Sequence, residues 1–165
     1  MKENNSNLKL SNKHIKTIST IGLLLTIIGI ADTIYLTIAH YSTVVSLVCP
    51  DKGIINCAKV TSSSYSEIFG VPVSLFGLIF FIGMLVLQLP MLWRSTNNLI
   101  RNGRLAYSLV GLATVFWFVY VEFHRLNAIC LYCTLVHVLT FGLFVSTIIG
   151  MSLINNDSVK VSAGK

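Results

Sequence analysis

Charged residues are scarce in this sequence, which has 12 lysines and arginines and 6 aspartates and glutamates among its 165 residues. Apolar residues make up 54% of the chain, which is too apolar for a soluble domain of this length. The basic residues are scattered between apolar runs and form no dense patch, so the net charge of +6 does not indicate a nucleic-acid-binding protein. The composition predicts a protein of the lipid bilayer.

A cleavage signal is also missing after the first apolar run. That run lacks a small-x-small exit and is too long for the core of a signal peptide. We therefore expect a retained signal anchor as the first helix of the protein.

Four apolar runs predict an all-α membrane protein, a bundle of four transmembrane helices, because each span needs about 20 apolar residues. The expected spans are 17–40, 72–93, 105–123 and 128–149. Together they form one membrane domain over 17–151, which leaves no room for a fused soluble domain. We expect frayed or disordered polar tails at 1–16 and 152–165.

The loop expected over 41–71 carries the pattern Ser64-Tyr-Ser-Glu67, which is typical of a helix N-terminus. It predicts a short interfacial helix that caps the bundle. A second, basic loop is expected around Arg94, Arg101 and Arg104, and a tight turn over 124–127 joins the last two spans.

Basic residues are divided unevenly between the two sides of this arrangement. The side of the termini holds Lys2, Lys9, Lys13, Lys16, Arg94, Arg101, Arg104, Lys160 and Lys165. The other side holds only Lys52, Lys59 and Arg125. Because the cytoplasmic side of a membrane protein is enriched in lysine and arginine, we expect a multi-pass protein of the cell membrane with both termini in the cytoplasm.

Cysteine is limited to four residues, in two pairs of unlike spacing. Cys49 and Cys57 lie in the first loop, and Cys130 and Cys133 lie where the last span begins. All four are expected on the outer side, where disulfides persist. A dithiol close to lipid can pass electrons to a lipid-soluble carrier, and a pair in a polar loop can collect them from a water-soluble protein.

The second pair is expected at the start of a helix. Asn127 is a suitable N-cap and would put Cys130 in the first helical turn, where free N–H groups and the helix dipole favour a thiolate. Cys133 would lie one turn deeper, on the same face as His137. Two interpretations of His137 stay open: a proton donor or acceptor beside the thiols, and a packing residue with a satisfied hydrogen bond.

Two other interpretations of the cysteines remain open. The pairs could be structural disulfides, although a Cys-x-x-Cys bridge closes a very short loop and stabilises little. Zinc binding is disfavoured, because Cys49 and Cys57 are spaced more widely than the pair in a zinc knuckle.

Ionisable residues inside the apolar runs are a further signal, because they are costly in a bilayer. Asp32 in the first span is either functional or paired. Glu122, His124 and Arg125 are expected to form a local interfacial cluster rather than a catalytic set.

The ordered set of these features resembles the vitamin K epoxide reductase family, in its bacterial or archaeal branch. The resemblance covers about residues 29–142. The matching pieces are the segment Asp32-Thr-Ile-Tyr-Leu-Thr-Ile-Ala-His40, the pair Cys49 and Cys57, Ser63, Ser74-Leu-Phe-Gly77, and Cys130-Leu-Tyr-Cys133.

The resemblance implies a four-helix bundle around a quinone, such as ubiquinone or menaquinone, with the loop capping the pocket. Cys133 would lie next to the quinone, and Cys130 would exchange with Cys57. Cys49 would exchange with a separate thioredoxin-fold protein, and the electrons taken from that protein would pass through the other cysteines to the membrane quinone pool. Ser63 would assist as a polar residue near these cysteines.

The quinone contacts expected from the resemblance are Cys133, His137, Val73 and Phe76. Vertebrate members of the family carry Asn and Tyr at the positions of Val73 and His137, so a plain quinone is favoured here over an epoxide. Two alternatives remain. One is a quinone-epoxide reductase that uses the same relay, and the other is a non-enzymatic membrane adaptor with structural disulfides.

Overall fold

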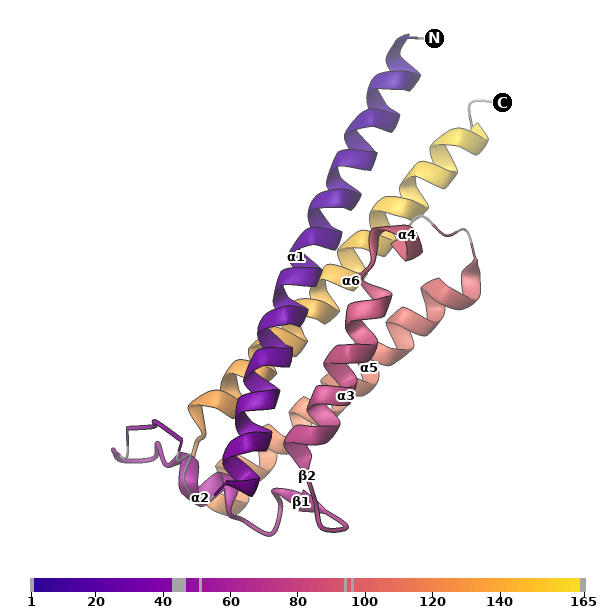
Figure 1. The fold of residues 1–165 in the computed structure, drawn as a ribbon. Helices are drawn as coiled ribbons and strands as arrows, with labels where there is room; N and C mark the ends of the chain where they lie inside the picture. The colour runs from indigo at the N-terminus through magenta and orange to yellow at the C-terminus, as the bar shows by residue number, and fades with distance from the viewer. Residues whose placement is uncertain (1, 43–46, 51, 94, 96, 164–165) are drawn as a thin grey trace.

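The protein is a bundle of helices that lie side by side and run along roughly the same direction (Figure 1). The computed structural model describes residues 2–42, 47–50, 52–93, 95 and 97–163, with side chains between residues 14 and 154. The four main helices are α1 (Lys2–Tyr41), α3 (Val73–Leu87), α5 (Asn98–Tyr120) and α6 (Leu131–Ala163). α1 packs against α6 and α3, and α5 packs against α6. The start of α1 and the end of α6 lie at the same end of the bundle (Figure 1).

Three helical stretches are long and apolar enough to cross a membrane. They are His14–Tyr41, Asn98–Leu126 and Leu131–Ile154. α3 is apolar but has only 15 residues, and at 1.5 Å per residue it covers about 22 Å of a hydrocarbon core of about 30 Å. The fold is therefore that of a helical membrane protein with three candidate spans and a shorter apolar helix. The four-span topology stays a prediction.

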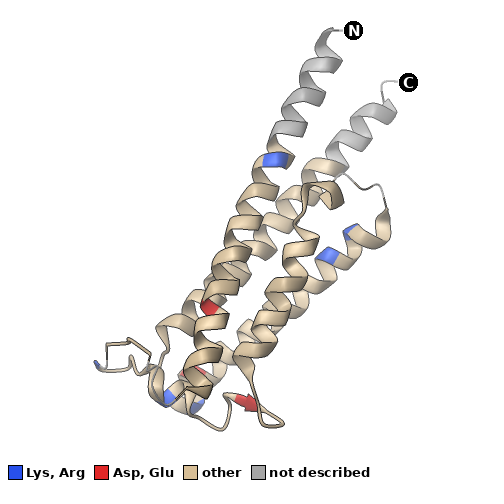
Figure 2. Ribbon diagram, viewed as in Figure 1, with Lys and Arg blue, Asp and Glu red and all other residues tan. Residues whose placement is uncertain are grey.

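The side chains of the bundle are distributed as a lipid environment requires. Thr26 and Thr33 are buried, and each hydroxyl donates to the carbonyl four residues earlier, so neither hydroxyl is left unpaired. Large apolar side chains instead point outward, among them Leu24, Ile79 and Val138. Most charged positions of the described helices lie near the two ends of the bundle (Figure 2).

The second expected span is broken near its end. α3 stops at Leu87, and a single turn, α4 (Pro90–Trp93), follows it. Pro90 has no N–H with which to continue the hydrogen bonds of α3, and its ring clashes with the preceding turn. The prediction of one helix over 72–93 was therefore wrong at its last turn.

Arg104 does not lie in a polar loop, because α5 begins before it and buries it. Its guanidinium carbon lies 3.9 Å from the centre of the Trp93 ring, and its Nε donates to the carbonyl of Leu87 at 3.0 Å. Arg101 also belongs to α5, and Arg94 lies outside the described residues. The expected basic loop is thus shorter, and Arg104 instead ties α5 to the break after α3.

The polar ends of the chain are helical rather than frayed. α1 begins at Lys2 and α6 ends at Ala163, so both helices continue into the segments expected as tails. Neither 2–16 nor 152–163 contains a proline or glycine that would stop a helix. The limits of the membrane domain stay a prediction.

The short helix of the outer loop lies earlier than expected. α2 (Cys57–Thr61) follows Asn56, whose side-chain oxygen accepts the N–H of Lys59 at 2.7 Å. Asparagine is a favoured N-cap because this bond pairs a backbone N–H of the first turn that has no partner within the helix. The short helix therefore carries one of the loop cysteines, a position that the sequence pattern did not indicate.

The Ser64–Glu67 pattern leads into a hairpin instead of a helix. β1 (Glu67–Ile68) pairs antiparallel with β2 (Val71–Pro72). Phe69 and Gly70 at the tip have φ of 53° and 77°, which no right-handed helix contains. The predicted helix at this position was wrong because the chain reverses within a few residues to enter α3.

The junction between α5 and α6 also differs from the expected turn. α5 continues into a π-helix, η1 (Val121–Leu126), and Asn127 then adopts a left-handed conformation with φ 45° and ψ 44°. Asn127 therefore ends one helix and does not cap the next, a conformation that asparagine tolerates better than most residues. α6 begins at Leu131, so Cys130 precedes the first turn rather than lying in it.

Candidate redox site

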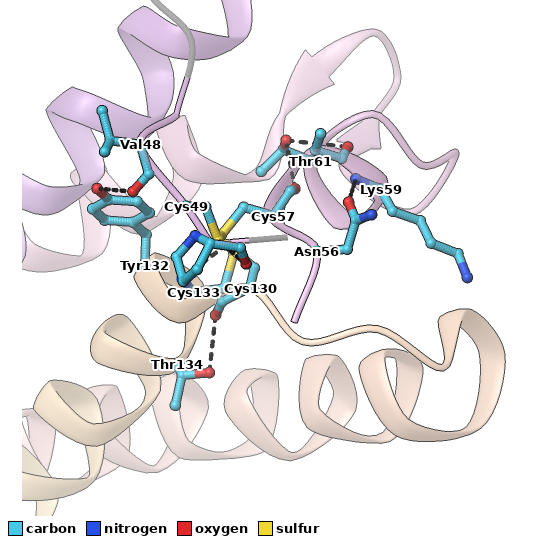
Figure 3. Close-up of a disulfide and its surroundings, with 12 residues drawn as sticks. Val48, Cys49, Asn56, Cys57, Lys59, Thr61, Cys130, Tyr132, Cys133 and Thr134 are labelled. Carbon is cyan, nitrogen blue, oxygen red and sulfur yellow. Dashed lines mark hydrogen bonds between the residues drawn. A yellow bond between two sulfur atoms is a disulfide. The ribbon is translucent and has the colours of Figure 1, made fainter. Parts of the chain in front are cut away.

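The four cysteines lie in one cluster at the loop end of the bundle (Figure 3). Cys49 and Cys57 form a disulfide, whereas Cys130 and Cys133 are free thiols. Cys57 and Cys130 belong to one buried apolar cluster, against which Cys49 and Cys133 pack. An oxidised pair therefore rests against a reduced pair.

A backbone bridge holds the loop against the start of α6. The Asn56 N–H donates to the Ile129 carbonyl at 3.1 Å, and the Ile129 N–H donates to the Ile54 carbonyl at 2.8 Å. Asn56 directly precedes Cys57, and Ile129 directly precedes Cys130. The bridge therefore aligns the loop with the start of α6 so that Cys57 and Cys130 lie next to each other.

Two tyrosines hold the residue before Cys49. The Val48 N–H donates to the hydroxyl of Tyr35 at 3.4 Å. The hydroxyl of Tyr132 donates to the Val48 carbonyl at 3.0 Å, as Figure 3 shows. The two rings pack with centroids 5.1 Å apart. Since Tyr35 comes from α1 and Tyr132 from α6, this tyrosine clamp ties the loop disulfide to two helices of the bundle.

Replacing Tyr132 with phenylalanine is expected to loosen the loop at Val48. The change keeps the ring and removes one hydrogen bond, worth about 1 kcal/mol net, so the loop should open about fivefold more often. Amide hydrogen exchange of the peptide that contains Val48 measures this directly. Tyr120→Phe, on the exposed face of α5, is the matched control. Equal protection in wild type and Tyr132→Phe would contradict a role of the clamp.

Cys130 caps α6 with its own sulfur. Its Sγ accepts the N–H of Cys133 at 3.3 Å, and its carbonyl accepts the N–H of Thr134 at 2.8 Å. The pKa of the Cys130 thiol is lowered, first by its side-chain hydrogen bond with Cys133 and further by the backbone N–H groups of Cys133 and Tyr132, against the opposing effect of burial. Cys130 is therefore a thiol that readily forms a nucleophilic thiolate.

A cavity of about 370 Å³ lies beside the disulfide cluster, and Val60 and Cys133 belong to both. Its walls come from α1, the outer loop, α3, α5, η1 and α6. Most of the lining is apolar or aromatic, including Phe76, Phe80 and Phe118. Cys133 borders the cavity and Cys130 does not. The free dithiol thus connects the disulfide to the cavity.

All of the expected quinone contacts border this cavity, namely Val73, Phe76, Cys133 and His137. An aromatic, mostly apolar pocket of this size fits a quinone ring, with a few polar groups to orient its oxygens. Ser63 also borders it, and its hydroxyl donates to the Val60 carbonyl at the end of α2. The roles of these five residues stay predictions.

Glu122 is a cavity residue that the sequence analysis missed. It borders the cavity and is 4% exposed, whereas His124 and Arg125 are exposed. The expected interfacial cluster of these three residues was wrong, because η1 turns Glu122 inward and the other two outward. A carboxylate at the end of an apolar run was the available signal. Asp32 is buried too, and its Oδ2 has no hydrogen-bond partner in the described structure.

A disulfide, a free dithiol and an apolar cavity lie together here at one end of a helical membrane protein, an arrangement typical of membrane redox proteins. The model of the vitamin K epoxide reductase family matches residues 20–148, which is most of the chain. The protein belongs to this family, and the resemblance seen in the sequence is confirmed. Membership indicates a redox function at the membrane.

Proposed function

We propose that the protein is a quinone-dependent thiol–disulfide oxidoreductase that supports disulfide formation in a thioredoxin-fold partner. The observation that carries this proposal is the position of the dithiol. Cys130 packs with Cys57 of the loop disulfide, and Cys133 borders the aromatic cavity. A pair placed in this way can take electrons on one side and release them on the other.

The proposed order of exchange follows from the exposure of the four sulfurs. Cys49 is half-buried, so a thiolate of the partner can attack it and reduce the loop disulfide. Cys57, which is 2% exposed, then attacks Cys130 of an oxidised Cys130–Cys133 pair and re-forms the Cys49–Cys57 disulfide when Cys49 resolves the bridge. The reduced Cys130–Cys133 pair is left with two electrons. A bound quinone supplies the acceptor for two electrons and two protons.

The proposed orientation places the cysteine cluster on the outer side of the cell membrane and both termini in the cytoplasm. Its support is the charge distribution in the sequence, together with the common end at which α1 begins and α6 finishes (Figure 1). The thioredoxin-fold partner is then an extracytoplasmic protein. Its thiols meet Cys49 at the end of the bundle that carries α2 and the hairpin.

Purified protein in detergent tests the proposal with a reduced thioredoxin-like protein and a soluble quinone. Wild type is expected to oxidise the thiols in a quinone-dependent reaction, and Cys133→Ala is expected to lose this activity, because the reduced pair no longer has a sulfur at the cavity. Gly103→Ala is the control, since no atom lies within 4 Å of the added methyl group.

Equal rates in wild type and Cys133→Ala would refute the proposed function. If the protein is instead a non-enzymatic adaptor whose cysteines are only structural, Cys133→Ala should be less stable than wild type, and the rate of quinone-dependent thiol oxidation should not change. A parallel assay with quinone epoxide separates the epoxide reductase alternative, which predicts faster consumption of the epoxide than of the quinone.

A further inference from the structure

We propose that Glu122 is the proton-transfer residue of this site and exchanges protons between the Cys130–Cys133 dithiol and the molecule in the cavity. The inference rests on the proposed function and assigns a role to a residue that the cysteine pattern does not include. Its basis is the position of one buried carboxylate between two thiols and an apolar cavity.

The geometry brings Glu122 to both thiols. The Glu122 carboxylate lies near the backbone N–H of Cys130. The charge of Glu122 also acts on the sulfurs of Cys130 and Cys133. Glu122 and Cys133 border the same cavity. A proton that leaves the dithiol therefore meets a carboxylate that already faces the acceptor side.

The backbone of Glu122 is fixed by the junction that leads into α6. Its carbonyl accepts the N–H of Ala128 at 3.2 Å and the N–H of the left-handed Asn127. These bonds tie the π-helical turn to the residues just before Cys130, so the backbone of Glu122 holds a fixed position beside that segment. Such a fixed position is what proton transfer requires, because donor and acceptor must lie within hydrogen-bond reach.

Other titratable side chains border the cavity, and their contacts differ from those of Glu122. They are His40, Tyr65, Tyr107, Cys133 and His137. His40 pairs with Glu67 of β1 at 3.2 Å, and the Tyr107 hydroxyl lies 3.3 Å from the Phe80 carbonyl. Among the described residues, the carboxylates whose charge acts on Cys133 are Glu122 and Asp32, and of these only Glu122 borders the cavity.

The proposed role balances the protons of the reaction. Oxidation of the dithiol forms the Cys130–Cys133 sulfur–sulfur bond and releases two electrons and two protons. Ionised Glu122 takes the proton of Cys133 as its thiolate forms, and the two electrons pass to the quinone. Glu122 then returns that proton to a quinone oxygen. Cys130 releases its proton to water, and water supplies the second proton that the quinone takes up.

Glu122→Gln tests this role because the amide keeps the shape and an acceptor oxygen for the Cys130 N–H. The turnover number for quinone-dependent thiol oxidation is expected to fall by about 100-fold or more, the range of a lost general acid–base, while KM for the quinone stays within a few-fold of wild type. Asp32→Asn is the matched comparison, since it removes the other buried carboxylate that acts on Cys133 but does not border the cavity.

A second measurement needs no quinone. Infrared difference spectra between the dithiol and disulfide forms, generated with a chemical oxidant, are expected to show a carboxyl protonation signal in wild type. The signal should disappear in Glu122→Gln and persist in Asp32→Asn. A signal that persists in Glu122→Gln, or that disappears in Asp32→Asn, would overturn the assignment.

The two measurements separate this inference from the proposed function. If wild type shows the carboxyl signal but no quinone-dependent turnover, the proposed function fails and the coupling between Glu122 and the dithiol stands. If wild type turns over and Glu122→Gln does so equally fast, the inference alone fails. Should Glu122→Gln not fold, Glu122→Asp retains a carboxyl group, and loss of the redox-linked signal in that variant would contradict the role.

Discussion

A disulfide between Cys57 and Cys130 is expected to accumulate when Cys133 is replaced with alanine. Cys130 is the thiol that readily ionises, and it packs in the same buried cluster as Cys57. Its thiolate attacks Cys57, the Cys57–Cys130 bond forms, and the Cys49–Cys57 bond breaks to release the Cys49 thiol. In wild type Cys133 resolves this bridge. Without Cys133 only Cys49 can reverse it, so the bridged species should become a major form.

A mass map of the variant under non-reducing conditions, after free thiols have been alkylated, detects the bridge. The double variant Cys130→Ser, Cys133→Ala is the control, and it should retain only the Cys49–Cys57 bond of the structure. A map of Cys133→Ala with a Cys49–Cys130 bridge in place of Cys57–Cys130 would reverse the proposed order of the loop cysteines. A map with neither bridge would contradict exchange between the pairs.

Gly29→Ala and Gly103→Ala are expected to change stability in opposite directions. A methyl group on Gly29 of α1 would overlap the ring of Phe81, which is fully buried in α3 and cannot move aside. Overpacking of this kind costs about 1–3 kcal/mol. A methyl group on Gly103 of α5 meets open space, and alanine is favoured over glycine within a helix by about 1 kcal/mol.

Thermal unfolding in one detergent, at one protein concentration, compares the two variants with wild type. Gly29→Ala should unfold at a lower temperature than wild type and Gly103→Ala at a higher one. Small residues allow membrane helices to approach closely, and α1 and α3 meet at Gly29 for this reason. If Gly29→Ala is as stable as wild type, the close approach of α1 and α3 is not as described.

The apolar runs were sufficient to predict a helical membrane protein, because the composition of each run by itself determines whether it is stable in a bilayer. The same holds for family membership, which depends on the order of Asp32, the two cysteine pairs and the intervening loop. Cys133 and His137 also share a helix face as expected, since a spacing of four residues places two side chains on one side of any helix. These features can be read directly from the sequence, because they do not depend on how the helices pack against one another.

Other expectations failed where a neighbouring segment determined the conformation. Asn127 has the chemistry of an N-cap, but the π-helical end of α5 places it in a left-handed turn, and Cys130 caps α6 instead. Arg104 has the charge of a loop residue, yet the Trp93 ring and the Leu87 carbonyl allow its burial. In both cases the side chain had two feasible environments, and the packing or conformation of an adjoining element selected one of them.

The sequence alone determined the membrane helices, the four sulfurs and their order along the chain, because these follow from composition and local spacing. Only the tertiary structure decided that Cys57 meets Cys130, that Cys133 borders the cavity, and that Glu122 lies buried beside both thiols. Each of these relations joins segments from different helices. Their geometry is set by how α1, α3, α5 and α6 pack, and no local pattern encodes that packing.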